Sequence, residues 1–109
     1  MNFNEYQDKA METAIYPNRG DNLVYAVLGL TNEAGEVAGK LKKCIRDNSG
    51  KLTPEIRQAV ADEVSDVMWY IAACCFELGV SMNDVAVSNL AKLKSRQERG
   101  VLGGSGDKR

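Results

Sequence analysis

The sequence contains no histidine, and only three of its 109 residues are cysteine. Without histidine the chain cannot build the Glu-x-x-His di-iron sites of some helical proteins, and a catalytic zinc site is disfavoured. The cysteines, Cys44, Cys74 and Cys75, lack metal-binding spacing, and an odd number is typical of reduced thiols in a cytosol. We therefore interpret the adjacent Cys74 and Cys75 as small core residues.

A strong excess of charge and long apolar runs are lacking as well. The 14 basic and 15 acidic residues leave a formal net charge of −1, so the chain as a whole does not attract nucleic acid or a membrane surface. The longest uncharged apolar stretch, residues 67–76, is too short to span a bilayer, and no signal-like segment opens the chain. We expect a soluble, cytoplasmic protein with one domain, residues 1–109.

Proline and glycine divide the chain into helical segments. The first is expected from Phe3 to about residue 14, because a proline and a glycine interrupt the chain at residues 16–20. The second is expected from near Asp21, interpreted as its N-cap, to about Arg46.

The third and fourth segments carry clearer end signals. Thr-Pro at residues 53–54 is an N-cap followed by proline at the first helical position, and Gly79 suits a left-handed C-cap. Residues 81–84 have the spacing of a capping box, and the fourth helix is expected to stop at Gly100. No stretch alternates as strands do, so the expected class is all-α, with a Gly-rich tail at residues 102–109.

Two acidic pairs have the spacing that places both side chains on one side of a helix. Glu33 and Glu36 lie in the second segment, and Glu63 and Asp66 in the third, each pair at i, i+3. Each pair lies beside an apolar stripe, on the same rotational side in both segments. If the two helices pack antiparallel, stripe against stripe, the four carboxylates come together. The expected stripes are Val27, Leu30, Ala34, Val37 and Leu41, and Val60, Val64, Val67, Ile71 and Leu78.

Clustered carboxylates repel one another unless a cation neutralises them or some are protonated. The third segment offers little relief, because no Lys or Arg lies between Arg57 and Lys92. Hard oxygen ligands of this kind suit Mg²⁺ or Mn²⁺ with a phosphate-bearing substrate. The competing interpretation is a solvated helix face, with Glu36 paired to Lys40 at i, i+4.

The two motifs, in this order, resemble a known family. EAGE at residues 33–36 followed by EVSD at 63–66 is similar to the E-x-x-E…E-x-x-D signature of MazG-like nucleotide pyrophosphohydrolases, in the all-α NTP pyrophosphatase superfamily. The similarity extends to LGL at 28–30 and VMWY at 67–70, and through residues 89–107. It implies a four-helix, MazG-like bundle with the acidic pairs on two antiparallel helices.

The resemblance also implies an activity. Relatives of this kind hydrolyse (deoxy)nucleoside triphosphates between the α- and β-phosphates with Mg²⁺, or Mn²⁺, in nucleotide-pool house-cleaning. Glu33, Glu36, Glu63 and Asp66 would be the metal ligands and catalytic residues. The sequence does not choose which of them accepts the proton of the attacking water, although Glu36 is one candidate. The resemblance further implies a homodimer or homotetramer with sites near the interface.

Basic side chains beside the acidic pairs are candidates for binding phosphate. Lys40 and Lys43 follow the first pair on roughly the same side of its segment. Asn89, Lys92 and Arg96 match the family's N-x-x-K…R pattern and share one face of the fourth segment, where cationic groups could bind phosphate oxygens. The alternative is a solvated cationic helix end that complements the helix dipole.

Aromatic and apolar residues of the third segment raise two further expectations. Tyr70 lies one turn after Asp66 and is a candidate for stacking on a nucleobase, whereas Trp69 is better explained by packing. Apolar residues, Trp69 and Phe76 among them, occur on every side of this segment, and a two-layer monomer cannot cover them all. We therefore expect a second subunit to cover this helix.

Two other classes of function remain open from the residues alone. One is a non-catalytic helical oligomerisation or interaction module with a solvated acidic edge. The other is a phosphomonoesterase that uses the same acidic cluster and releases orthophosphate. No residue pattern encodes the base or the sugar of a substrate.

Overall fold

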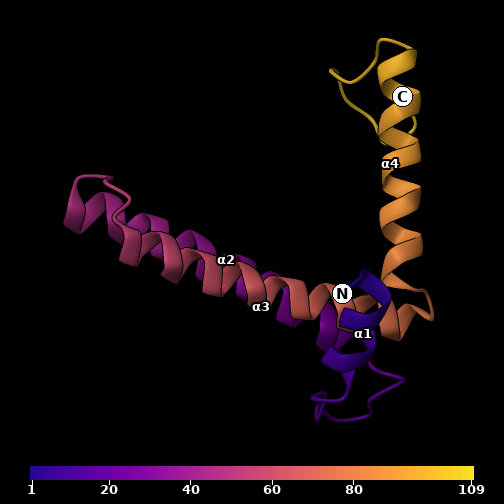
Figure 1. Ribbon diagram of the computed structural model, residues 1–109, viewed down its shortest axis with the longest axis horizontal. Coiled ribbons are helices and arrows are strands. Elements are labelled where there is room, and N and C mark those ends of the chain that lie inside the picture. The colour runs from indigo at the N-terminus through magenta and orange to yellow at the C-terminus, as the bar shows by residue number, and fades with distance from the viewer.

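The computed structural model describes residues 1–109 and contains four helices and no strand, which confirms the all-α class (Figure 1). The helices are α1, Phe3–Met11; α2, Leu23–Asn48; α3, Pro54–Leu78; and α4, Met82–Glu98.

Each helix begins after a residue whose side chain accepts a hydrogen bond from the first turn. Thr53 and Ser81 fill this role for α3 and α4, as predicted. The predicted cap of α2 is wrong by one residue, because Asn22 accepts from the Tyr25 backbone N–H at 3.1 Å. The backbone N–H of Asp21 instead closes the preceding turn on the carbonyl of Asn18.

The predicted ends are right for α3 and approximate elsewhere. Gly79 adopts the left-handed conformation, φ 71°, directly after Leu78. Helix α2 continues two residues past Arg46, and Ser49 ends it with φ 54°. Helix α1 ends at Met11 rather than near residue 14, because its last turn tightens into i→i−3 hydrogen bonds.

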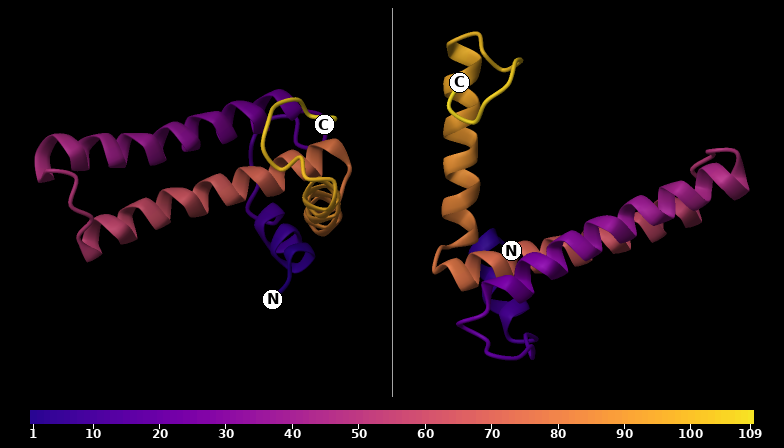
Figure 2. Two further views of the ribbon diagram at one scale, coloured as in Figure 1. Left: turned by 90° about the horizontal axis from the view of Figure 1, so that it is seen from above. Right: turned by 180° about the vertical axis from the view of Figure 1, so that it is seen from behind.

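Helices α2 and α3 run side by side and antiparallel, forming a long hairpin (Figure 2). Helix α1 packs against α3 and α4, and α4 leaves the end of α3 at 99° without contacting α2. The radius of gyration is 16.8 Å, whereas a compact chain of this length would have about 13 Å. One chain is therefore extended, with two arms that meet at α1 (Figure 1).

The bend between α3 and α4 is held by a buried glutamine of α1. Gln7 is 8% exposed, and its side-chain amide donates to the carbonyl of Val80 at 3.2 Å. Its Oε1 accepts from the backbone N–H of Met82 at 2.8 Å. Both polar groups of the side chain are therefore used at the corner, which fixes the direction in which α4 departs.

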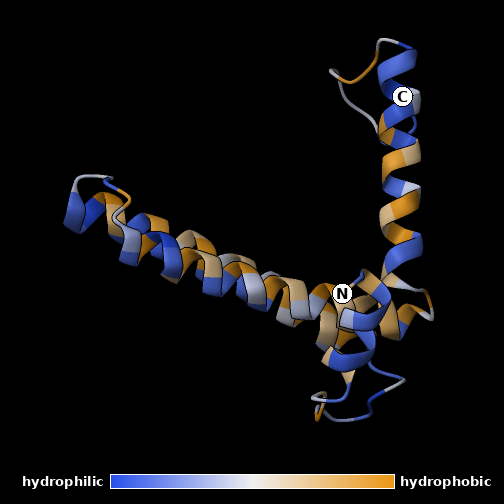
Figure 3. Cartoon of the chain, viewed as in Figure 1, coloured by the Kyte–Doolittle hydropathy of each residue, from blue (hydrophilic) through white to orange (hydrophobic).

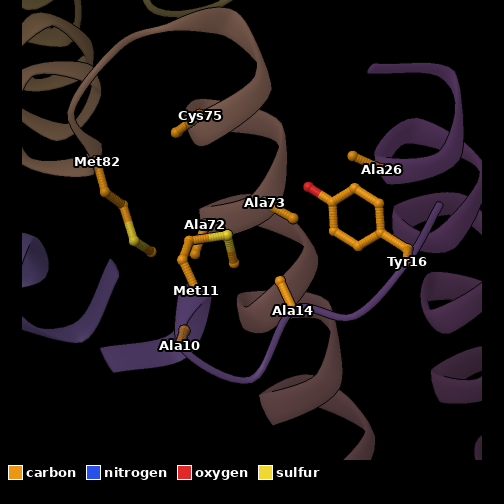
Figure 4. Packing of buried hydrophobic residues seen from close by; sticks show 9 residues of the cluster. All are labelled: Ala10, Met11, Ala14, Tyr16, Ala26, Ala72, Ala73, Cys75 and Met82. Carbon is orange, nitrogen blue, oxygen red and sulfur yellow. The ribbon is translucent and has the colours of Figure 1, made fainter. Parts of the chain in front are cut away.

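The core lies where α1, the C-terminal half of α3 and the first turns of α2 meet (Figure 4). Ala26, Ala72 and Ala73 are fully buried, and such small side chains let helices approach closely. Cys75 is 4% exposed and Cys74 packs beside this cluster, which confirms both as core thiols. All three cysteines are free.

The connection between α1 and α2 is tied to α3 by one carboxylate. Glu77 accepts from the hydroxyl of Tyr16 at 2.6 Å and from the backbone N–H groups of Gly20 and Asn22 at 3.0 and 3.2 Å. These hydrogen bonds, the one from Tyr16 foremost, lower the pKa of Glu77. No motif or spacing in the sequence predicted this role of Glu77.

The contact between α2 and α3 is rotated from the predicted one. Ala26, Glu33 and Lys40 lie on its less exposed side, whereas Val27 and Leu41 of the predicted stripe are 45% and 40% exposed. On α3, Val64 and Ile71 are likewise 46% and 38% exposed. The expectation of stripe-to-stripe packing is therefore right only in part. Leu30 and Val37 of α2 and Val60 and Val67 of α3 are partly buried, whereas the other members of each stripe face outward.

Hydrophobic residues also recur along α4 between its start and its hydrophilic far end (Figure 3). No single helix is long and apolar enough to cross a membrane. Helices α3 and α4 meet that requirement only when taken together across their bend.

Candidate metal centre

Three carboxylates from the two long helices meet midway along the hairpin. One oxygen from each of Glu33, Glu63 and Asp66 lies within 4.8 Å of the others. Glu33 comes from α2, and the i, i+3 spacing of the other two places both on the side of α3 that faces it. Glu33 and Glu63 are partly buried and Asp66 is exposed. Glu36, the fourth predicted ligand, is exposed and lies outside this group.

The charges of this cluster act on one another. The pKa of Glu33 is raised, first by its partial burial and then by the negative charges of Asp66, Glu63 and Glu36. Glu36 is therefore close enough to act electrostatically on Glu33. The crowding of negative charge that the sequence predicted is present in the structure.

One cation approaches the cluster. The Nζ of Lys40 lies 3.8 Å from Oε1 of Glu63, so the pair bridges α2 and α3. The predicted alternative, a pair between Lys40 and Glu36 along α2, is not formed, because Lys40 points across the hairpin. At this length and with Lys40 41% exposed, the bridge contributes little to stability. One ammonium group also leaves most of the negative charge uncompensated.

The donor set fits a hard divalent cation. Oxygens that ligate one Mg²⁺ or Ca²⁺ ion lie at most about 4–5 Å apart, twice the usual ion–oxygen distance. The three carboxylate oxygens lie within 4.8 Å of one another, a span that suits Ca²⁺ and exceeds the about 4.2 Å between opposed Mg²⁺ ligands, so small side-chain movements would bring them onto one Mg²⁺ ion. With carboxylates alone, and neither histidine nor cysteine in the group, soft or imidazole-seeking metals are disfavoured.

Tyrosines surround the acidic group, and two of them were not found from the sequence. Burial raises the pKa of Tyr70, followed by its hydrogen bond with Tyr25 and the charges of Glu33 and Asp66. Burial and the charge of Asp66 also raise the pKa of Tyr6, from α1. Tyr6 and Tyr25 carry no motif, and only the way α1 and the start of α2 pack onto α3 brings them here.

Trp69 and Phe76, expected to be covered by a second subunit, have partners within the chain. Trp69 donates its Nε1–H to Oγ1 of Thr13 at 2.9 Å and meets the ring of Tyr16 edge-on. The guanidinium of Arg19 lies 4.9 Å from the centre of the Phe76 ring. One chain therefore already covers part of both side chains, because the segment between α1 and α2 folds over this end of α3.

The predicted phosphate-binding residues fall into two places. Lys40 and Lys43 line a hollow of ≈ 210 Å³ toward the tip of the hairpin. Asn89 and Lys92 line another hollow, of ≈ 540 Å³, along α4. Helix α4 contacts α3 but not α2, and no hydrogen bond or ion pair joins Asn89 or Lys92 to the three carboxylates of the same chain.

Arg96 is engaged by the C-terminal tail. It is 8% exposed, and its Nη2 donates to the carbonyl of Asp107 at 2.7 Å. The guanidinium of Arg109 closes the tail on itself through the carbonyls of Val101, Leu102, Gly103 and Gly106. The Gly-rich tail is thus folded against the end of α4.

The raised pKa of Glu33 predicts how pH affects the metal-free protein. The folded state holds this proton more tightly than the unfolded chain, so stability falls as pH rises from the ordinary value of 4.5 through the raised one. Glu33→Gln removes this loss. In chelator, thermal melts across the acid-to-neutral range should show the variant gaining over the unaltered protein as pH rises, with no gain at the acid end. A difference independent of pH would contradict this assignment.

The fold and the site together define a class: an all-α protein whose antiparallel helix pair presents a cluster of three carboxylates. Comparison with known families agrees, because residues 22–101 match the MazG nucleotide pyrophosphohydrolase domain. The chain belongs to this family. It is also 46% identical over 114 aligned positions to the Gene 37 protein of Mycobacterium phage L5, covering 100% of both proteins. No solved structure matches the chain.

Proposed function

We propose that this protein is a Mg²⁺-dependent pyrophosphohydrolase that converts (deoxy)nucleoside triphosphates to monophosphates and pyrophosphate. The observation that carries the proposal is the meeting of Glu33, Glu63 and Asp66 within 4.8 Å, in a chain of the MazG family. Mg²⁺ is the choice among hard cations because it combines carboxylate ligands with substrate phosphates. Mn²⁺ has similar ligand preferences and could replace it.

The proposed roles divide the four acidic residues. Glu33, Glu63 and Asp66 hold the ion, which would neutralise phosphate oxygens and lower the pKa of a bound water. Glu36 stands outside that group and accepts a proton from the water that attacks the α-phosphorus. The charge of Glu36 is also one of the causes that raise the pKa of Glu33, so Glu36 lies near enough to the ligand group to interact with it.

Substrate contacts are proposed for the basic residues. Lys40 is placed to exchange its long bridge to Glu63 for a phosphate oxygen, and Lys43 lies beside it. Asn89 and Lys92 would bind substrate held by another copy of the chain, since α4 projects away from the hairpin of its own. Arg96 would keep its hydrogen bond to the tail and use its remaining N–H groups to bind the phosphates of that substrate.

We further propose that the active unit is a homo-oligomer, dimer or tetramer. The accessible surface is 7694 Å², whereas a compact monomer of this mass exposes about 5,900 Å². Only 12 of 109 residues are buried. The apolar corner between α3 and α4, a hollow of ≈ 430 Å³ that includes Met68, Ile71 and Val85, is a surface that a second copy would cover.

The activity is placed in the cytoplasm, where the three free thiols would stay reduced. Neither a membrane nor nucleic acid is a proposed partner, since the formal net charge is only −1.

The decisive experiment identifies products. The pure protein is incubated with each common ribo- and deoxyribonucleoside triphosphate, with Mg²⁺ or with excess chelator. We expect monophosphate and pyrophosphate in equal amounts, and no reaction in chelator. Orthophosphate as the first product would instead identify a phosphomonoesterase. No turnover together with no triphosphate binding would identify a helical interaction module.

A further inference from the structure

A glycine of α2 lies against a tyrosine ring of α3. A methyl group added at Gly29 would collide with Cδ1, Cε1 and Cζ of Tyr70. Gly35 and Gly39, the other glycines of α2, would meet nothing within 4 Å. Only at Gly29, therefore, does the packing of the hairpin require the absence of a side chain.

Neighbouring side chains pack against the ring of Tyr70 and restrict its movement away from Gly29. It meets the indole of Trp69 edge-on, with centroids 4.9 Å apart and planes at 78°. The indole is itself held by its 2.9 Å hydrogen bond to Thr13 and by the edge of Tyr16. Moving the ring away from Gly29 would disturb each of these contacts.

This contact lies one helical turn from the carboxylates on both helices. Gly29 precedes Glu33 by four residues and Tyr70 follows Asp66 by four, so each pair shares a helix face. After burial and Tyr25, the charges of Glu33 and Asp66 also raise the pKa of Tyr70. On the other side of the contact, Ala26 and Ala73 are fully buried.

We propose that Gly29 and Tyr70 are positioning residues that set the separation of α2 and α3, and with it the gap between Glu33 and the α3 carboxylates. The ring rests on the bare backbone of Gly29 and acts as a spacer of fixed thickness. Mg²⁺ tolerates little departure from ion–oxygen distances near 2.0–2.1 Å, so a change in this separation weakens its site. The proposal rests on the proposed function for the identity of the ion, and it gives Tyr70 a role distinct from stacking on a nucleobase.

The test compares two glycine substitutions on one helix. Mn²⁺ binding by the full chain is measured by calorimetry or electron paramagnetic resonance for the unaltered protein, Gly29→Ala and Gly39→Ala. Gly29→Ala should bind roughly 10- to 100-fold more weakly, the usual effect of losing a group that orients metal ligands. Gly39→Ala should bind as the unaltered protein does. Equal affinities for all three, or equal losses in both variants, would overturn the proposal.

A double variant separates positioning from general damage. Tyr70→Val removes every ring atom that the new methyl group would meet, so Gly29→Ala combined with Tyr70→Val should regain affinity relative to Gly29→Ala alone. No recovery in a folded double variant would count against a spacer.

Thermal melting of the metal-free proteins tests the contact without any ion. Gly29→Ala should lower the melting temperature, whereas Gly39→Ala should raise it, because alanine is the better helix former. Equal rises in both would overturn the spacer. An unaltered protein that binds no Mn²⁺ would contradict the proposed function, and this comparison would still decide whether the Gly29–Tyr70 contact is real.

Discussion

Asp66→Asn should reduce triphosphate hydrolysis at least about 100-fold, because an ion that has lost a charged ligand no longer supplies several kcal/mol of transition-state stabilisation. Glu63→Gln should have a similar effect. Both changes preserve shape and remove only charge, so the circular dichroism spectrum should stay helical. Hydrolysis is measured as pyrophosphate release at saturating Mg²⁺.

In chelator, Asp66→Asn should melt at a higher temperature than the unaltered protein, since it removes one of the charges that raise the pKa of Glu33. It is the cleaner of the two variants, because Glu63→Gln also breaks the bridge to Lys40. Asp62→Asn, one turn away on α3 and outside the carboxylate group, is the matched control and should retain activity. Full activity of Asp66→Asn, or of the unaltered protein in excess chelator, would refute the metal centre.

Ile71→Glu should convert the oligomer to monomers and greatly reduce activity. Ile71 is 38% exposed in the single chain and lines the apolar corner between α3 and α4. A carboxylate buried there against a second copy without a partner would cost several kcal/mol, enough to dissociate most small interfaces. Sedimentation at micromolar concentration should give the unaltered protein a mass of at least twice the 11.9 kDa of one chain. The Ile71→Glu variant should sediment at the mass of one chain.

Ile15→Glu is the matched control, since the same substitution is made at a side chain that is 96% exposed and does not line the apolar corner. It should alter neither mass nor activity. A fully active unaltered protein that sediments at 11.9 kDa would refute the proposal that a second copy covers the apolar corner between α3 and α4. Loss of mass in both variants would show that added charge alone, and not its location, causes dissociation.

Local sequence signals predicted the ends of the helices well where a cap has its own chemistry. Thr53, Pro54 and Gly79 fix α3 through hydrogen bonds and backbone angles that depend on neighbouring residues only. The i, i+3 spacing likewise predicted that Glu63 and Asp66 share a side of α3. The start of α2 was missed by one residue, because Asp21 and Asn22 are both good caps and the preceding turn decides between them.

Long-range packing was harder to predict. The apolar stripes predicted only part of the contact surface between α2 and α3, because the contact is rotated and also includes the small residues Ala26 and Gly29. The roles of Gln7 and Glu77 depend on groups more than fifty residues away. No periodicity within a helix encodes such contacts, and the neighbours of Trp69 and Phe76 were missed for the same reason.

The uneven distribution of buried residues along the hairpin has a consequence for its amide hydrogens. Cys44, at 4% exposed, is the one buried side chain in the arm beyond Glu33, whereas Ala72 and Ala73 near the opposite end are fully buried. Deuterium should therefore enter the backbone of the arm much sooner than that of the core, because local opening there separates few packed atoms. Glu33 and Glu63 lie between these two regions. An ion held by Glu33 and Glu63 would link α2 and α3 where this part of the hairpin begins. Slower hydrogen exchange toward the tip of the hairpin would therefore show that the metal site is occupied.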